Sequence, residues 1–352
     1  MANYDLSDDE DYIKSIIDTS TFSKYEDVQL LNALRGHSNI PITSMPQMES
    51  DDMMFVYFTR PNLNLSDLSL SRNRRYQHHT SKEPNEMNNL IRATLSPYEV
   101  KMGLVSNIAN TNSPFIPMLS NTLLELSGMP DEVIKSWDSP AGMVGEQWGH
   151  ANSTIEFKGS IEINLTFQSI AGGPVAKLFD VWTTYESDVR YGRLMPHPYC
   201  IASRETDYFS AIYILILNAN FKIKHIAKTR GYPIANPKGE KFTYRRGEDV
   251  SGKYPTFQTR FKCYGVDYDD PALLQEFNTS MMAFNSDIKS TVLGSDKSVV
   301  EVPAKFKALF QNECYPYIDL RYNTLEFLLP TSKFEVKDKP LNNVDEEKKD
   351  DN

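Results

Sequence analysis

The segment 161–168, IEINLTFQ, constrains the fold more strongly than any other stretch of the sequence. Its apolar and polar residues alternate strictly, with Ile161, Ile163, Leu165 and Phe167 at the apolar positions. Because successive side chains of a strand point to opposite faces, this pattern predicts a strand with one face in the core and one polar face. The chain must therefore contain a sheet that is covered on at least one side.

Three other segments predict further strands. Segment 256–268 alternates in the same way and places Phe257, Phe261 and Cys263 on one side. Segment 207–218, DYFSAIYILILN, is continuously apolar, which is typical of a strand covered on both faces, and a hairpin turn is expected at Asn218 to Asn220. Segment 55–65, FVYFTRPNLNL, predicts a first strand that stops at Arg60-Pro61, since proline cannot donate to a sheet ladder.

Two helices are expected beside these strands. Pro174 follows two glycines and begins a run with apolar residues at intervals of three or four, and Asp270-Pro271 begins a second such run. Strands and helices do not alternate regularly, so a parallel sheet is not expected. The sequence predicts a mainly β (α+β) fold, an antiparallel β-sandwich or partial barrel with a packed amphipathic helix. The expected core residues are Phe58, Ile163, Leu165, Phe167, Leu178, Phe179, Trp182, Tyr185, Ile214 and Phe261.

Four regions are expected along the chain. Residues 1–50 form an extended arm with one short helix, because Val28, Leu31 and Leu34 recur at helical spacing before Gly36. Residues 51–280 form the β domain, which includes a long exposed loop or hairpin at 66–89. Residues 281–336 are a C-terminal extension. Residues 337–352 are almost free of apolar side chains, and we expect a disordered acidic tail.

Composition narrows the classes of function. The formal net charge of −10 argues against a protein that binds duplex nucleic acid, which needs clustered Lys and Arg. Three widely spaced cysteines indicate neither a disulfide framework nor a zinc site. The acidic N-terminus does not resemble a signal peptide, and no apolar run is long enough for a membrane span. We expect a protein made in the cytoplasm, with no membrane partner.

No catalytic motif is present. AGGPVAK at 171–177 lacks the hydroxyl that follows lysine in a phosphate-binding loop, and neither H-E-x-x-H nor G-x-S-x-G occurs. We expect no catalytic, metal-binding or cofactor-binding residues, and no enzyme. Glu156 with Glu162 leaves open an alternative, a carbohydrate-binding or glycan-cleaving β-sandwich protein. Asp267, Asp269 and Asp270 fit a turn and a helix cap better than acid–base chemistry.

Two basic runs with interleaved aromatic residues predict contact surfaces. RNRRYQHH at 72–79 and TYRRGEDV at 243–250 fit docking on an acidic neighbouring subunit better than binding of single-stranded nucleic acid, given the net charge. The candidate subunit contacts are Arg60, Arg72, Arg74, Arg75, Tyr76, Arg245 and Arg246.

The order of these segments resembles the tail-tube-like proteins of contractile bacteriophage tails, which include the tube protein and proteins of the tube–baseplate junction. The segments are FVYFTRPNLNL, SPFIPMLSN, GSIEINLTFQS, LFDVWTTYESDV, AIYILILNANFKIKHIAKTRGYPI and FQTRFKCYGVDYDDPALLQEFN, which span about residues 50–280.

The resemblance implies antiparallel sheets with a helix alongside and six copies in a ring. It also implies partners in the tube, sheath and baseplate, DNA passing through the lumen without specific binding, and a place in the virion tail after assembly in the host cytoplasm. An assembly factor absent from the virion is a further alternative.

Overall fold

A computed structural model describes residues 52–152, 159–236, 238, 256–292, 299–302 and 314–331. The chain divides into two compact units, Met1–Asp52 and Met53–Asn352, and every element below belongs to the second. The helix expected in the N-terminal arm and the tail expected at 337–352 lie outside the described residues. Within the described ranges, no helix is both long and apolar enough to cross a bilayer.

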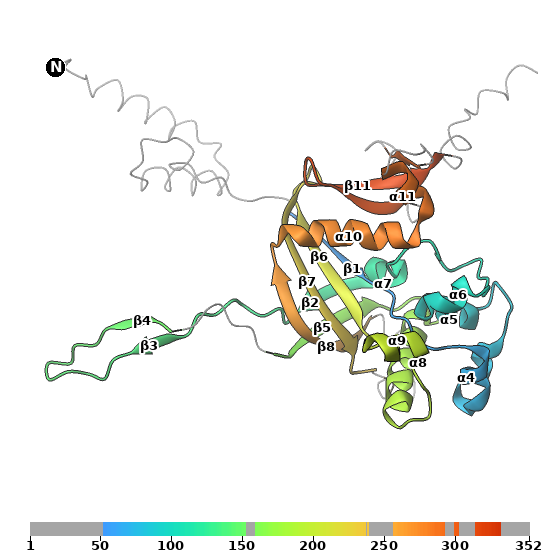
Figure 1. Ribbon diagram of the computed structural model, residues 1–352, viewed down its shortest axis with the longest axis horizontal. Helices are drawn as coiled ribbons and strands as arrows, with labels where there is room; N and C mark the ends of the chain where they lie inside the picture. The colour runs from blue at the N-terminus through green and yellow to red at the C-terminus, as the bar shows by residue number, and fades with distance from the viewer. Residues whose placement is uncertain are drawn as a thin grey trace, which may run out of the picture. The chain divides into compact units, whose positions relative to one another are not determined.

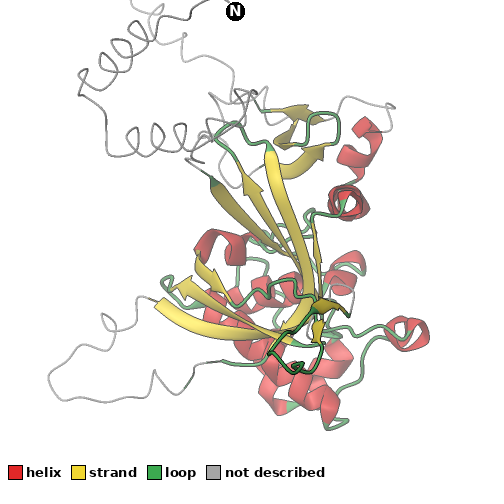
Figure 2. Cartoon of the chain, turned by 90° about the vertical axis from the view of Figure 1, so that its left-hand side faces the viewer, coloured by secondary structure: helices red, strands yellow, loops and turns green. Residues whose placement is uncertain are grey.

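The main element is a curled antiparallel sheet of six strands in the order β1-β6-β7-β8-β5-β2 (Figure 1). Figure 2, turned by 90°, shows the curl along the strands. The strands are β1 (Met53–Phe58), β2 (Leu123–Ser127), β5 (Ile161–Gln168), β6 (Ser210–Leu217), β7 (Ile223–Pro233) and β8 (Thr256–Tyr268).

Strand β5 confirms the alternation read from its sequence. Ile161, Ile163, Leu165 and Phe167 are buried, while Glu162, Asn164 and Gln168 are exposed. The strand pairs with β8 in the register Ile163↔Phe261, so the apolar rows of both strands enter the same core. In β6, residues 212–215 are all buried, which confirms a strand covered on both faces.

The hairpin between β6 and β7 turns where the asparagines predict. The backbone N–H of Asn218 donates to the Lys222 carbonyl at 3.0 Å. The Asn218 side-chain oxygen accepts from the N–H groups of Asn220 and Lys222, also at 3.0 Å. Phe221 closes the turn with φ of 59°, a left-handed conformation that is uncommon outside glycine.

Helix α8 (Pro174–Arg190) covers one face of the sheet, as expected, and begins at Pro174. The ring of Trp182 meets Phe261 of β8 edge-on at 5.8 Å between centroids, and its Nε1–H donates to the Tyr208 carbonyl at 2.9 Å. All ten expected core residues are buried, none more than 5% exposed. Burial of this aromatic layer is the main apolar contribution on this side of the sheet.

Among the described residues, the opposite face is covered over β1, β6 and β7 but not over β5 and β8. Helix α10 (Pro271–Phe284) lies there, and the ring of Phe277 contacts those of Tyr57, Phe115 and Tyr213. The Asp270 carboxylate accepts from the Ala272 N–H at 2.8 Å, which confirms the predicted cap. The same cluster includes residues of a small antiparallel sheet next to α10. The strands of this small sheet are β9 (Val299–Glu301), β10 (Tyr315–Asp319) and β11 (Thr324–Pro330), in the order β10-β11-β9. Helix α11 (Ser286–Val292) follows α10 in the chain.

The fold is thus mixed α/β, with one curled sheet that matches the partial-barrel alternative. Helices and a three-stranded sheet, not a second large sheet, cover its apolar faces.

The expectation of a long loop at 66–89 is wrong. The segment contains α4 (Asp67–Arg72), the 3-10 helix η1 (Arg74–Thr80) and the start of α5 (Met87–Leu95). Leu70, Tyr76 and His79 are buried, which fixes these short helices on the body of the protein. The other short helices are α6 (Pro97–Lys101), α7 (Pro117–Thr122) and α9 (Pro198–Ser203).

Candidate functional site

Arg60 lies at the end of β1 and is only 8% exposed, so it does not serve as the surface contact that its sequence suggested. Its guanidinium donates to the carbonyls of Ala93, Thr94, Thr111 and Ser113, at 3.0 Å for Thr94. Burial lowers the pKa of Arg60 to about 10. Arg60 therefore joins β1 to the end of α5 and to the segment before α7.

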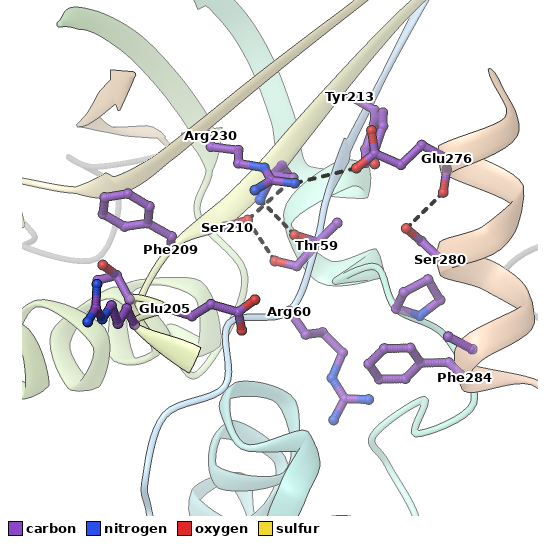
Figure 3. A pocket seen from close by; sticks show the side chains of 15 residues that line it. Thr59, Arg60, Glu205, Phe209, Ser210, Tyr213, Arg230, Glu276, Ser280 and Phe284 are labelled. Carbon is purple, nitrogen blue, oxygen red and sulfur yellow. Dashed lines mark hydrogen bonds and ion pairs between the residues drawn. The ribbon is translucent and has the colours of Figure 1, made fainter. Parts of the chain in front are cut away.

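A cavity of about 570 Å³ opens beside Arg60, between the start of β6, β7 and the C-terminal half of α10 (Figure 3). The Ser210 hydroxyl donates to the Thr59 carbonyl at 2.6 Å, and the Ser280 hydroxyl donates to the Glu276 carbonyl at 3.0 Å. Arg230 pairs with Glu276 at 3.5 Å.

Neither serine is hydrogen-bonded to a base, and the described residues that line the cavity include no His or Cys. The cavity could accept a side chain of another protein through polar and aromatic contacts. No activated nucleophile is present among its described lining residues.

The first basic run is divided between the surface and the interior. Arg72, Arg74 and Arg75 are exposed on α4 and η1, whereas Tyr76 is 2% exposed. The Tyr76 hydroxyl donates to Asp188 of α8 at 3.1 Å. Burial, reinforced by the Asp188 carboxylate, raises the pKa of Tyr76. Tyr76 is thus not a free contact residue, because its ring anchors η1 to α8.

The second basic run cannot be placed. Arg245 and Arg246 lie outside the described residues, and so does Glu156, on which the glycan alternative partly depends.

Among the described strands, β1 and β2 each have one neighbour in the sheet, so their outer edges are open. On β1 the Phe58 carbonyl accepts from the Ile116 N–H at 2.8 Å on the side away from β6. By the two-residue alternation of a strand, Met54 and Val56 direct their backbone groups to the same side. No described strand pairs with that part of β1. Strand β2 carries a bulge at Leu124, which is 57% exposed.

The uncovered face over β5 and β8 is polar and close to neutral in charge. Glu162 pairs with Lys262 at 3.1 Å and with Arg260 at 3.4 Å. The Thr166 hydroxyl donates to Glu125 of β2 at 3.4 Å. The other exposed side chains of this face include the uncharged Asn164, Gln168 and Gln258, and one further carboxylate, Asp267 of β8. Clustered unpaired cations, which phosphate binding requires, are not found among the described residues of this face.

A buried pair of carboxyl groups lies beside α8. The Tyr185 hydroxyl donates to Asp207, while Glu186 Oε1 and Asp207 Oδ1 are buried without a hydrogen-bond partner among the described residues. Burial, with Asp207 nearby, raises the pKa of Glu186 to about 9. Burial also raises the pKa of Asp207. Glu186 is therefore protonated at neutral pH.

One surface was missed at the sequence level. Residues 129–152 form a hairpin of β3 (Ser136–Asp138) and β4 (Gly149–Ala151), and its tryptophans, Trp137 and Trp148, are 42% and 72% exposed. The sequence reads only as turns around Pro140, Gly142 and Gly145. The two tryptophans on either side of a glycine-rich turn were the available signal.

These features define a class of protein: a mixed α/β protein built on a curled antiparallel sheet whose two edges have no further partner among the described strands. Residues 1–342 match the family described as "Putative phage tail tube protein". Because the match spans nearly the whole chain, the protein belongs to this phage tail tube family. It is a tail tube-like structural protein of the virion, and such a protein assembles with other tail proteins.

Among solved structures, the cap that terminates the tube of the anti-feeding prophage matches with 11% sequence identity and a TM-score of 0.26. That match covers 44% of this chain and 82% of the cap chain. No curated protein matches the sequence.

Proposed function

We propose that this chain forms a ring, six copies around, in the tube of a contractile tail or at the junction of tube and baseplate. The observation that carries the proposal is the six-stranded sheet with open edges at β1 and β2. An exposed sheet edge is a template for pairing with another strand. If the β1 edge of one copy pairs with the β2 edge of the next, a closed ring leaves no free edge.

We further propose that the polar face over β5 and β8 lines a channel through which DNA passes, and that the protein has no enzymatic role. The cations of this face, Arg260 and Lys262, are both paired with Glu162. A wall with balanced charge would not hold phosphates by counterion release, so DNA could move along it.

Electron microscopy of the purified full-length chain, together with its mass in solution, tests ring formation. The expected result is closed rings of one size with a central opening. A protein that stays at the monomer mass of 40.2 kDa and does not bind other tail proteins would contradict the proposal.

Added positive charge tests the channel wall. Asn164→Lys with Gln258→Lys should leave rings intact but make them retain DNA at low salt, because each copy gains two unpaired cations on the wall. The matched control is Asn85→Lys with Ser203→Lys, which adds the same charge at exposed positions before α5 and at the end of α9. Equal retention of DNA by both variants, measured by gel mobility, would place the polar face outside the channel.

A further inference from the structure

The hairpin arm, residues 129–152, exposes an unusual amount of apolar surface. Six large apolar side chains of the arm are each at least 42% exposed: Val133, Ile134, Trp137, Met143, Val144 and Trp148. Exposed apolar side chains concentrated in this way on one short segment mark an interaction site. The arm therefore carries the side chains of an interface.

The arm is held to the body at its base, where Met129 packs against the core and the Tyr268 hydroxyl donates to the Pro130 carbonyl at 2.7 Å. Among the described strands, β3 and β4 pair only with each other, as a separate two-stranded ribbon (Figure 1). The internal contacts include the Ser139 N–H donating to the Trp148 carbonyl at 2.9 Å and a ring contact between Trp137 and His150 at 5.3 Å. A two-stranded hairpin alone is at best marginally stable in water, so a partner would stabilise it.

The arm is also acidic. It contains four carboxylates, Asp131, Glu132, Asp138 and Glu146, against one lysine, Lys135, which leaves three formal negative charges. A partner surface that complements the arm must therefore offer cations next to apolar or aromatic groups.

The same chain offers such a surface, which we call the arginine surface: Arg72, Arg74, Arg75 and Arg193. Asp188 holds its parts together, because it accepts from Asn73 at 2.9 Å and pairs with Arg193 at 3.3 Å. Arg72, Arg74 and Arg75 are exposed and form no ion pair with a described residue.

Apolar groups and a cavity accompany these arginines. Leu68, 62% exposed, lies one helical turn before Arg72, and the ring of Tyr191 contacts Arg193 at 5.3 Å. A cavity of about 350 Å³ opens beside Arg75 and is lined by Tyr76, His78 and Asp180, among others. A tryptophan that enters it would meet the Arg75 guanidinium, a favourable cation–π partner.

We propose that the hairpin arm of one copy docks on the arginine surface of a second copy, with Trp148 as an anchor beside Arg75. This inference extends the proposed assembly of identical copies and specifies one of its contacts. Opposite charge on two surfaces of the same chain favours a second copy as the partner, and Trp and Arg are the side chains most enriched at the energetic centres of interfaces.

Charge reversal in the full-length chain tests the contact. One variant makes the arm basic (Glu132→Lys, Asp138→Lys, Glu146→Lys), a second makes the surface acidic (Arg72→Glu, Arg74→Glu, Arg75→Glu), and a third combines them. Each single set should weaken self-association in sedimentation velocity by at least about tenfold. The combined variant should recover most of the association, which a merely structural effect would not allow.

A matched pair of aromatic variants tests the anchor. Trp148→Ala should also weaken self-association about tenfold or more. Tyr322→Ala removes an aromatic side chain of similar exposure, 71%, and should change nothing. Thermal unfolding shows whether each variant folds. If the variant with the basic arm does not fold, the effects of Trp148→Ala and of the acidic arginine surface on self-association decide the test.

The outcomes separate this inference from the proposed ring. Rings and self-association that are unaffected by all of these changes would overturn the docking contact while leaving the ring intact. Association that depends on charge as stated, without rings in the microscope, would support the contact and contradict the ring. Loss of association without recovery in the combined variant would also overturn the contact, and would favour a different protein as the partner of the arm.

Discussion

Arginine is usually exposed, but Arg60 is buried and cross-links two segments of the backbone. Its fork of N–H groups satisfies four backbone carbonyls from two segments, a geometry that lysine cannot reproduce. We expect Arg60→Lys to lower the free energy of unfolding by about 3 kcal/mol, because buried carbonyls lose charged donors. Urea unfolding measures this, with Arg75→Lys on the exposed surface as the control. Equal stability of the two variants would show that the Arg60 hydrogen bonds do not stabilise the fold.

The raised pKa of Glu186 makes the free energy of unfolding depend on pH. Its pKa is about 9 in the folded protein, well above the usual 4.5, so between these values the folded state binds a proton that the unfolded state has lost. The stabilisation is full below pH 4.5 and is lost as pH rises toward 9, at up to about 1.4 kcal/mol per pH unit.

The clearest window for this measurement is pH 7 to 9, above the usual pKa of histidine. Burial lowers the pKa of His79 to about 4, so His79 is neutral here in both states. The wild type should lose stability across this window, and Glu186→Gln should remove most of that slope. A slope that persists in the variant would assign the pH dependence to other groups.

At the scale of elements, helix α8 stabilises the sheet by burying its apolar side chains against it. Trp182 is fully buried against β8, so Trp182→Ala should cost about 3 to 5 kcal/mol of stability by leaving a cavity. Trp148→Ala, in dilute monomeric protein, removes an exposed ring and should change stability by less than about 0.5 kcal/mol. Denaturant unfolding of both variants checks the contrast, and a similar loss in both would mean that the hairpin arm belongs to the folded core.

The open edge of β1 makes a second prediction at this scale. Met54 is 56% exposed and directs its N–H away from β6, so Met54→Pro should leave the monomer folded but block ring formation. Phe55 directs its N–H toward β6, so Phe55→Pro should destabilise the monomer itself. Circular dichroism and electron microscopy distinguish the two effects. Rings that form normally with Met54→Pro would exclude the β1 edge from the contact.

The elements differ in how far their sequences could predict them. Strands β5 and β8 and helices α8 and α10 were predicted correctly because each is long enough to show its period. Helices α4 and η1 are only six and seven residues long, too short for a clear period. Tyr76 is buried there through Asp188, 112 positions later in the chain, and no local pattern encodes that contact. The hairpin arm was missed for a related reason, since its apolar side chains face solvent and follow no core pattern.

At the scale of the molecule, the two faces of the sheet have different tasks. One face is covered along its length by an aromatic core around α8, and the other is divided between the cluster under α10 and the polar surface over β5 and β8. A polar face and two sheet edges that no described element covers fit the ring proposed above, in which neighbouring copies would pair at these edges.

Cryo-electron microscopy of tails from virions that contain this chain tests the ring most directly. The expected density shows six copies around the tail axis, with β1 of one copy beside β2 of the next and the β5–β8 face toward the lumen. Density that places the chain as single copies outside the tube, or with the β5–β8 face turned away from the axis, would contradict a channel-lining ring.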